Sequence, residues 1–318
     1  MANTITHVYF TEKSLPLKQP YKLSFTTLNE FKVFTVNLLI AGEKYVGEVV
    51  PLFGYNNENE ETLRTFYGQH LTKLIGEKTD VARKKINSIS SDFNFSKSAI
   101  LTALDFFESP ELINGTNQLF KVDFVVPLSV TDNFIKFEQN TAIKIKLTGS
   151  LTEDKKGLIN FFEINKDIKH PVRLDANQAY TLNQACDVFQ FISDNTWKNK
   201  IAYIEQPLPA NNWEQAAQIV KRFPEIAMML DESVVSNNDI QRCKKIGVTF
   251  VKFKLYKQGG ITELETQIEL AHKLGLKIVL GNGVAGRLTN QIENYLYLKH
   301  HSKIYGASEA NGFLKFVN

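Results

Sequence analysis

Acidic residues end several short apolar runs in the second half of the chain. Asp175 ends the run in VRLDAN, Glu205 the run in YIEQPL and Asp231 the run in MMLDES. Each acid taken alone could simply cap the next helix, but carboxylates at the ends of consecutive strands converge if the strands form a barrel. Converged carboxylates repel one another unless a cation lies between them, and hard oxygen ligands suit Mg²⁺ or Mn²⁺. No His or Cys accompanies the three acids, so zinc is not expected.

Two pairs of lysines flank these acids in the sequence. Lys144 and Lys146 alternate in AIKIKL, which places both side chains on the same side of a strand. Lys252 and Lys254 alternate in the same way in VKFKL. On the inner side of a barrel these ammonium groups would crowd the mouth. Crowding and partial desolvation lower the pKa of a lysine towards neutrality, where it can act as a base. The alternative is that these lysines snorkel on the outer face.

A cation between two lysine-bearing strands suits the removal of a proton α to a carboxylate. A proton α to a carboxylate is very weakly acidic, and its removal requires a cation on the carboxylate oxygens to hold the charge of the developing enediolate. Mg²⁺ with a lysine base is one solution to this problem. Lysines on opposite faces of the substrate permit inversion at the α-carbon, cyclisation or elimination.

The spacing of the charged residues indicates the elements that carry them. The steps from Lys146 to Asp175, Glu205, Asp231 and Lys254 are 29, 30, 26 and 23 residues, about one βα unit each. Strands that alternate with helices at this interval predict a parallel sheet, and eight strand candidates favour an α/β fold of the modified TIM-type (β/α) barrel. An open doubly wound sheet is the alternative. The expected strands are FKVDFVVPL, AIKIKL, VRLDA, IAYIEQP, IAMMLDE, FVKFKL, KIVLGN and KIYGASEA, and the expected helices are 158–166, 181–196, 213–222, 238–246, 261–274 and 289–299.

The first third of the chain has a different pattern. Two β-rich runs meet at Gly42-Glu43, which predicts a hairpin, and helical patterns follow. Strands followed by helices predict a separate α+β domain, and the Pro, Gly and Asn residues of SPELINGTNQ mark its end. The expected strands are 31–42 and 44–52, the expected helices 60–75 and 96–107, and the expected domains an N-terminal α+β capping domain (1–115) and a barrel (116–318).

Composition limits the class of protein. A chain of 318 residues with 43% hydrophobic content can bury a large core, and a formal net charge of +3 gives no basis for nucleic-acid binding. No apolar run reaches about 18 residues, so no membrane span is expected, and the N-terminus lacks the pattern of a signal peptide. Two cysteines without CxxC spacing are expected to be reduced. These features favour a cytoplasmic protein that acts on a small molecule.

The segment GNGVAG (281–286) fits a second pattern, G-x-G-x-x-G after an apolar run. Glu309 lies about 20 residues further on, as an acid does in dinucleotide-binding sites. Only about 30 residues follow the segment, too few for the successive βαβ units of that fold. We therefore expect a loop at the seventh strand that contacts the substrate or an anion.

Several motifs, in this order and at this spacing, resemble the mandelate racemase/muconate lactonizing enzyme family of the enolase superfamily. They are KIK (144–146), RLDAN (173–177), IEQPL (204–208), LDES (230–233) and KLYKQGG (254–260). The resemblance covers nearly the whole chain and implies Mg²⁺ ligands at Asp175, Glu205 and Asp231. It also implies acid/base roles for Lys146 and Lys254 and an electrostatic role for Lys144. A lysine at the sixth strand without a histidine at the seventh resembles the muconate-lactonizing subgroup.

The same resemblance implies a cap whose loops, around 19–27 and 52–56, close over a carboxylate substrate, and it implies a homo-oligomer. Dipeptide epimerases of the family carry Asp-x-Asp at the eighth strand to hold the substrate's ammonium group, whereas this chain has Glu309 and Asn311. GNGVAG lacks the acid of many relatives, and little chain is left for a C-terminal segment that returns to the cap. The expected substrate-binding residues are Asn177, Asn282, Glu309 and Asn311.

These residues lead to one functional hypothesis and three alternatives. We expect a Mg²⁺-dependent isomerase or lyase that removes a proton α to a substrate carboxylate through a metal-stabilised enediolate, as a racemase, epimerase or cycloisomerase does. The named alternative is a syn-dehydratase similar to o-succinylbenzoate synthase, in which Lys146 alone is the acid/base and Lys254 acts electrostatically. The others are a barrel that binds a metal or acidic ligand without turnover, and a dehydrogenase.

Overall fold

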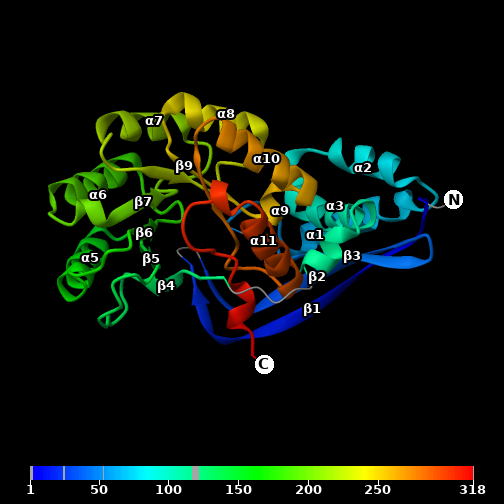
Figure 1. The fold of residues 1–318 in the computed structure, drawn as a ribbon, viewed down its shortest axis with the longest axis horizontal. Helices are drawn as coiled ribbons and strands as arrows, with labels where there is room; N and C mark the ends of the chain where they lie inside the picture. Colours follow the sequence, from blue (N-terminus) through cyan, green and yellow to red (C-terminus); the bar gives the residue numbers. More distant parts are fainter. Residues whose placement is uncertain (1–2, 24–25, 53, 117–121, 318) are drawn as a thin grey trace.

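The N-terminal part of the chain forms a three-stranded antiparallel sheet covered by helices (Figure 1). The computed structural model describes residues 3–23, 26–52, 54–116 and 122–317. Ala41 and Gly42, both with positive φ (55° and 85°), form the tight turn of the predicted hairpin. The strands are β1 (Ile5–Lys22), β2 (Thr27–Ile40) and β3 (Glu43–Val49), in that order across the sheet, and the helices are α1 (Glu60–His70), α2 (Thr79–Asn87), α3 (Asn94–Glu108) and α4 (Glu111–Thr116).

The sequence does not predict β1. Two prolines, Pro16 and Pro20, interrupt its 18 residues, and polar residues fall on both of its faces. As an edge strand it tolerates proline, because a missing N–H on the outer side removes no bond to a partner strand. The pairing with β2 shifts register between Pro16 and Tyr21, and Tyr21 then reaches the barrel.

The second part of the chain is a parallel barrel with helices outside it. Seven strands pair in chain order, and the helices between them pack on the outer face, except for the short helix 255–258, which packs against α3 of the cap (Figure 1). The strands are β4 (Val126–Ser129), β5 (Ile143–Lys146), β6 (Val172–Asp175), β7 (Ile201–Glu205), β8 (Met228–Leu230), β9 (Phe250–Phe253) and β10 (Lys277–Leu280). The helices are α5 (Leu151–Ile164), α6 (Leu182–Asp194), α7 (Trp213–Arg222), α8 (Asn237–Ile246), α9 (Leu255–Gln258), α10 (Ile261–Lys273) and α11 (Arg287–Lys299).

Residues 304–309 close the barrel, although they do not form the continuous eighth strand that KIYGASEA predicts. On one side Tyr305 N–H donates to the carbonyl of Ile278 in β10 (2.7 Å). On the other side Val125 N–H donates to the carbonyl of Ser308 (3.1 Å). Gly306, with φ of 65°, breaks the extended backbone between these contacts. The closed ring confirms the TIM-type barrel and excludes the open doubly wound sheet.

Closure fixes which strand ends face each other. The order β4 to β10 with the closing segment gives a ring of eight positions, in which β5 and β9 are four positions apart. Lys146, the last residue of β5, and Lys254, directly after β9, therefore lie on opposite sides of the mouth. Tyr203, Met229, Phe250 and Val279 fill the barrel interior below them as a small apolar cluster.

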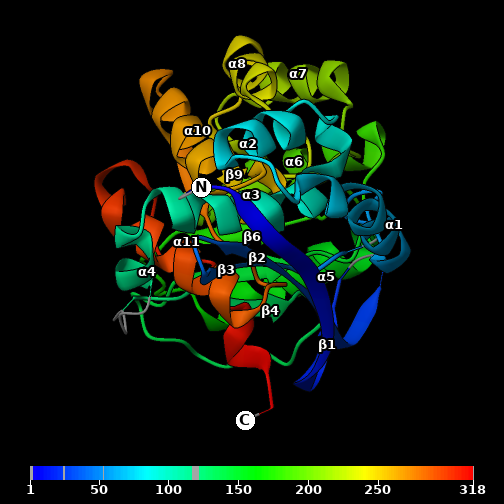
Figure 2. The same cartoon turned by 90° about the vertical axis from the view of Figure 1, so that its right-hand side faces the viewer.

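Helix α3 joins the cap to the barrel, and Figure 2 shows the cap in front of the barrel helices. Gly47 of β3 permits close packing, since a Cβ there would lie 2.0 Å from the carbonyl oxygen of Ala99 in α3. Asp105 of α3 accepts hydrogen bonds from the N–H of Ile261 (2.8 Å) and the hydroxyl of Thr262 (2.6 Å) at the start of α10. The predicted boundary segment 109–118 falls partly on α4 and partly outside the described residues, so the domain limits stay predictions.

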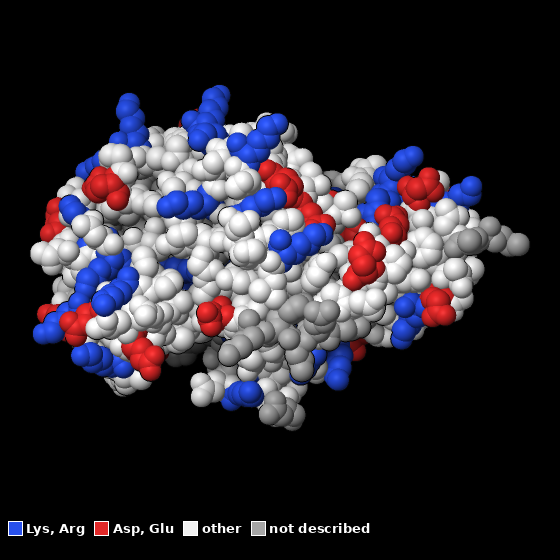
Figure 3. Space-filling model, viewed as in Figure 1, with Lys and Arg blue, Asp and Glu red and all other residues white. Residues whose placement is uncertain are grey.

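The end of the described chain returns to the cap, which corrects the expectation that too little chain is left for this. Val317 N–H donates to the carbonyl of Pro16 (3.0 Å), and Phe316 pairs with Leu17 of β1. Elsewhere basic and acidic side chains are interspersed on the face seen in Figure 3. No helix among the described residues is long and apolar enough to cross a membrane.

Candidate active site

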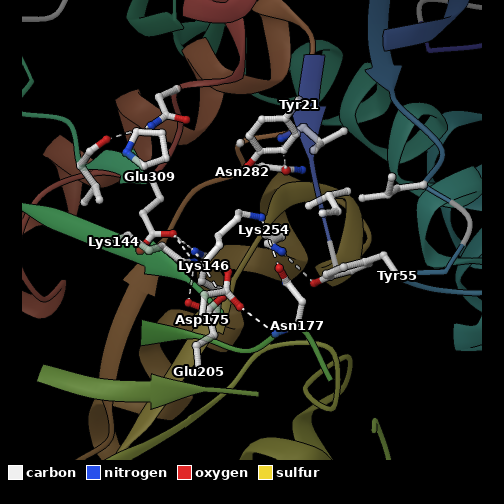
Figure 4. A pocket seen from close by; sticks show the side chains of 18 residues that line it. Tyr21, Tyr55, Lys144, Lys146, Asp175, Asn177, Glu205, Lys254, Asn282 and Glu309 are labelled. Atoms are coloured by element: carbon white, nitrogen blue, oxygen red, sulfur yellow. Dashed lines mark hydrogen bonds and ion pairs between the residues drawn. The ribbon is translucent and has the colours of Figure 1, made fainter. Parts of the chain in front are cut away.

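One pocket opens at the carboxyl ends of the barrel strands, beneath two segments of the cap (Figure 4). Tyr21 comes from the end of β1, and Tyr55 comes from the loop after β3. The cap segments 19–27 and 52–56 thus contribute to the pocket as expected, residues 24, 25 and 53 lying outside the described ranges; their closure over a substrate stays a prediction. The predicted residues that line the pocket are Lys144, Lys146, Asp175, Asn177, Glu205, Lys254, Asn282, Glu309 and Asn311.

Lys144, on the second barrel strand, pairs with the carboxylates at the third and fourth barrel positions. Its Nζ lies 2.9 Å from Asp175 Oδ2 and 2.5 Å from Glu205 Oε2. Burial alone would raise the pKa of Asp175, but the ammonium groups of Lys144 and Lys146 lower it below its ordinary value. For Glu205, burial and the charge of Asp175 dominate and raise the pKa to about 7. The two carboxylates therefore converge on a single cation, as the spacing predicts, but that cation is a lysine.

Glu309 is held by cations on both of its oxygens. Lys144 Nζ lies 2.9 Å from Oε2, Lys252 also contacts Oε2, and Arg173 donates to Oε1 at 2.7 Å. Tyr203 contributes a longer bond to Oε1 (3.4 Å). Burial alone would raise the pKa of Glu309, but these cations hold it well below its ordinary value. Glu309 is thus an anchored anion deep in the pocket.

Asp231 lies against Lys254 at the fifth barrel position. Lys254 Nζ is 2.6 Å from Oδ2, while Lys257 Nζ (2.8 Å) and the Tyr55 hydroxyl (2.8 Å) both contact Oδ1. Burial opposes ionisation, yet Lys254 and Lys257 hold the pKa of Asp231 well below its ordinary value. The cap loop that carries Tyr55 is fixed by Glu58, which accepts the N–H groups at the start of α3 (2.8 Å each).

The expected lowering of lysine pKa values is wrong for Lys144 and Lys254. Burial alone would lower the pKa of Lys254, but the carboxylates of Asp231, Glu232 and Glu205 together raise it. The pKa of Lys144 is raised well above its ordinary value by Asp175, Glu205 and Glu309, again against burial. The cause is that carboxylates, not other ammonium groups, are the nearest charged neighbours of both side chains.

Lys146 occupies a different environment from the other predicted lysines. Its Nζ donates to the amide oxygen of Asn177 (3.3 Å) and lies 5.0 Å from the centre of the Tyr21 ring. Lys315, from the C-terminal turn, lies 4.9 Å from the same ring and donates to Asn311 Oδ1 (2.9 Å). The pocket therefore has one end crowded with ion pairs and another where lysines meet neutral oxygens and an aromatic ring.

Other parts of the protein pack closely against the glycines of the loop GNGVAG. Gly281 has φ of 124°, and a Cβ there would lie 2.2 Å from the backbone N of Ala310. At the start of α11, where a dinucleotide phosphate would bind, the Glu48 carboxylate accepts the N–H of Thr289 (2.7 Å). A Cβ on Gly286 would collide with the same carboxylate at 2.4 Å. The glycines therefore serve packing and the cap contact, which argues against the dinucleotide alternative.

The donor chemistry of the site fits a hard divalent cation. In the part of the chain that the structure describes, no three Asp, Glu, His or Cys side chains are arranged to hold one metal ion. Lys144 occupies the point on which Asp175 and Glu205 converge, so these carboxylates already share a cation. Beside Asp231, both carboxylate oxygens of Glu232 are buried and have no hydrogen-bond partner among the described residues. Such oxygens suit Mg²⁺.

Four charged residues of the site were not predicted, and three of them lie inside the quoted motifs. Arg173 opens RLDAN, Glu232 follows the acid of LDES, and Lys257 is the second lysine of KLYKQGG. Each could have been recognised as a charged residue beside a predicted one. Lys315 has no such signal, because only the return of the C-terminal turn to the cap brings it near the pocket.

Comparisons with known proteins agree with this geometry. The family model "Enolase C-terminal domain-like" matches residues 132–302, more than half of the chain. The L-Ala-D/L-Glu epimerase of Thermotoga maritima is 26% identical over 294 residues, which cover 87% of this chain and 84% of that protein. The muconate lactonizing enzyme from Pseudomonas fluorescens, complexed with muconolactone, has a TM-score of 0.84 at 21% identity, covering 100% of this chain and 90% of that one.

A second solved structure bears on the metal. The dipeptide epimerase from Cytophaga hutchinsonii, complexed with Mg and the dipeptide D-Ala-L-Val, has a TM-score of 0.81 at 22% identity, covering 99% of this chain and 89% of that one. Barrel, cap and matches together define an isomerase of the epimerase or cycloisomerase type. The chain belongs to the mandelate racemase/muconate lactonizing enzyme family of the enolase superfamily.

Proposed function

We propose that this chain removes a proton α to a substrate carboxylate, using a divalent cation and two lysines on opposite sides of the pocket. The observation that carries the proposal is the placement of Lys146 and Lys254 at β5 and β9, across one pocket that also contains Asp175 and Glu205. Opposed acid/base groups can remove a proton from one face of a carbon and return one to the other. The epimerase from Thermotoga maritima is named for an interconversion of this kind.

Three carboxylates would hold the cation. Asp175 and Glu205 already converge on one positive charge, and Asp231 lies at the next strand end. Mg²⁺, or Mn²⁺ in its place, would neutralise negative charge on the substrate carboxylate when bound. Lys144 is the electrostatic residue of this group, because its raised pKa keeps it positively charged beside the acids.

The two opposed lysines lie in different surroundings. Lys254 holds its proton, since Asp231 and Glu232 raise its pKa against the effect of burial. Lys146 contacts an amide oxygen and has no ion pair with a described carboxylate, so it can take up a proton without breaking one. Lys146 therefore removes the α-proton and Lys254 donates one to the opposite face. The same state of Lys254 also favours the second candidate, a syn-dehydratase in which Lys254 stays charged and Lys146 does all proton transfer.

Proton exchange tests the proposal. Wild type and variants are incubated with Mg²⁺ in D₂O with a panel of dipeptides and dicarboxylic acids, and loss of the α-proton signal is followed by NMR. Lys146→Ala should slow exchange by about 10²–10⁴-fold. Lys254→Ala should retain exchange from one enantiomer and lose interconversion. The exposed Lys136→Ala is the control and should behave as wild type.

Two further outcomes separate the alternatives. Lys254→Arg keeps the charge but is a poor proton donor, so activity retained in this variant would favour the syn-dehydratase. Full exchange in both alanine variants would refute the role of these lysines. Mg²⁺ binding without turnover of any acid in the panel would favour a barrel that only binds its ligand.

A further inference from the structure

We propose that Lys315, Asn311 and Tyr21 form a subsite for a second negatively charged group of the substrate, so that the substrate is a dicarboxylate with an apolar spacer rather than a dipeptide with a free ammonium group. This inference rests on the proposed function, in which the first carboxylate lies at the cation end of the pocket. It extends that function to the opposite end.

The ammonium group of Lys315 has no described carboxylate as an ion-pair partner. Its Nζ donates to the carbonyls of Gly283 (3.0 Å) and Asn311 (3.4 Å) and to Asn311 Oδ1 (2.9 Å), all of them neutral oxygens. No described carboxylate lies within ion-pair distance of it. The side chain is half-buried, and its neighbours Asn311, Gly283 and Tyr21 line the pocket. An ammonium group in such a place is stabilised by any anion that enters.

A second lysine, the proposed base Lys146, adds positive charge at this end when it is protonated. The Nζ atoms of Lys146 and Lys315 lie 5.0 Å and 4.9 Å from the centre of the same Tyr21 ring. Burial lowers the pKa of Lys315, and the charge of Lys146 lowers it further. The pKa of the Tyr21 hydroxyl is also lowered, because Lys146 and Lys315 outweigh the effect of burial. The shift at Tyr21 is what nearby positive charge produces, and a bound anion would oppose it.

The acids of the pocket leave no place for a substrate ammonium group. Glu309 stands where the resemblance places an acid for that group, but cations engage both of its oxygens. Asp175 and Glu205 are paired with Lys144 and lie at the cation end. Asn311 is neutral, and its amide oxygen accepts from Lys315. An ammonium group would therefore meet Lys315 with no unpaired described carboxylate to receive it, which is repulsive.

Apolar side chains also line the pocket. Leu52 of the cap, Val125 before β4 and Val284 of the seventh-strand loop all line the pocket. Contact with these side chains favours a substrate that carries an apolar segment beside its anionic groups. A short dicarboxylic acid meets all of these conditions.

Matched acids test the subsite by calorimetry in the presence of Mg²⁺. Adipate and hexanoate share a six-carbon chain and differ by one carboxylate, while L-Ala-L-Val carries one carboxylate and a free ammonium group. Wild type should bind adipate at least about tenfold more tightly than either, because tenfold corresponds to a single modest charge-assisted contact. Lys315→Met should remove most of this preference and leave hexanoate binding unchanged, whereas Lys315→Arg should keep the preference.

Several results would overturn the proposal. Equal affinity for adipate and hexanoate in wild type would do so, as would an equal loss for both acids in Lys315→Met, or tighter binding of L-Ala-L-Val than of adipate. Thermal unfolding of each variant shows whether it is folded. If Lys315→Met does not fold, loss of the adipate preference in a folded Lys315→Arg would still contradict the proposal. Selective adipate binding without α-proton exchange by any acid would refute the proposed function and leave the subsite standing. Exchange by dipeptides without adipate binding would do the reverse.

Discussion

The two ends of the pocket differ in how their charges are compensated. At the inner end Lys144, Lys252 and Arg173 meet three carboxylates, and the described contacts are ion pairs among buried side chains. At the outer end Lys146 and Lys315 meet amide and carbonyl oxygens beside the Tyr21 ring. Buried pairs fix a geometry but are costly to break, whereas a half-buried charge beside neutral oxygens gains from a ligand of opposite charge. The ion pairs of the inner end therefore stabilise the fold around the proposed cation site, whereas the outer end is left for recognition of a second group.

Removing one partner from the inner end should have the largest effect on stability. Arg173→Met deletes the cation on Glu309 Oε1 and the donor to the carbonyl of Ala307 (3.0 Å). Breaking a buried pair costs about 3–5 kcal/mol, and the lower value is expected here because Lys144 and Lys252 still neutralise Glu309. Urea unfolding at constant m-value measures the change.

The outer end supplies the matched control. Lys315→Met also removes a cation but breaks no ion pair with a described carboxylate, so its free energy of unfolding should change by less than about 1 kcal/mol. If the two variants lose the same stability, the distinction between a structural end and a recognition end is wrong.

The sequence predicts the inner end better than the outer one, for a physical reason. Lys144, Asp175 and Glu205 sit at the ends of strands whose period is visible, and parallel pairing brings such ends together whatever the loops do. Helix α7 begins and ends where the pattern over 213–222 predicts, because its apolar face is regular. The closing segment is not a regular strand, because Gly306 interrupts it.

Long-range contacts explain what the sequence does not reveal. Tyr21 reaches the pocket only because an edge strand with two prolines extends from the cap to the barrel, and β1 carries no clear alternation. Lys315 depends on the pairing of Phe316 with Leu17, two positions far apart in the chain. The state of Lys254 depends on which neighbour is nearest, and spacing alone cannot distinguish Asp231 from another lysine.

A buried acid outside the pocket tests whether cations, rather than hydrogen bonds, keep an acid ionised. Burial raises the pKa of Glu48 to about 7, although Thr289 donates hydrogen bonds to it, and no described cation pairs with it. Its folded pKa exceeds the unfolded value of 4.5, so the folded state binds more protons between these pH values. The stability it contributes is present below pH 4.5 and is lost as the pH rises through 7.

Glu48→Gln should therefore reduce the fall in stability between pH 5 and 8 by up to about 3 kcal/mol, since each pKa unit corresponds to about 1.4 kcal/mol. Unfolding in urea at a series of pH values measures this slope. The exposed Glu163→Gln should leave it unchanged. A slope identical to wild type in Glu48→Gln would show that hydrogen bonds alone keep this acid ionised, as cations do for Glu309.

The increase in the free energy of unfolding on Mg²⁺ binding should depend on residues of the inner end and not on residues of the outer end. Saturating Mg²⁺ should stabilise wild type by about 1–3 kcal/mol, the range expected when the ion is present at up to about 100 times its dissociation constant. Asp175→Asn and Glu205→Gln remove inner-end donors and should abolish most of this gain. Lys315→Met should keep it in full. Thermal unfolding with and without Mg²⁺ measures the gain, and an equal loss in all three variants would contradict the assignment of the cation to the inner end.

The smallest expected effect on stability comes from adding one methyl group to the outer end. A Cβ on Gly283 would lie 3.1 Å from the Tyr21 hydroxyl, 3.5 Å from Lys315 Nζ and 3.6 Å from Asn311 Oδ1. Gly283 does not have a positive φ, so alanine fits the backbone and the free energy of unfolding should change by less than about 1 kcal/mol. The methyl group nevertheless occupies space beside Lys315 that a distal carboxylate would need.

Calorimetry should therefore show adipate binding weakened by about three- to tenfold in Gly283→Ala, with hexanoate affected less. Gly68→Ala is the matched control, because a Cβ at this exposed position of α1 meets nothing within 4 Å, so any gain in helix stability leaves the ligand untouched. Unchanged adipate binding in Gly283→Ala would place the second carboxylate away from Tyr21 and Lys315. Because the fold is barely perturbed, this variant tests recognition at the outer end separately from the ion pairs of the inner end.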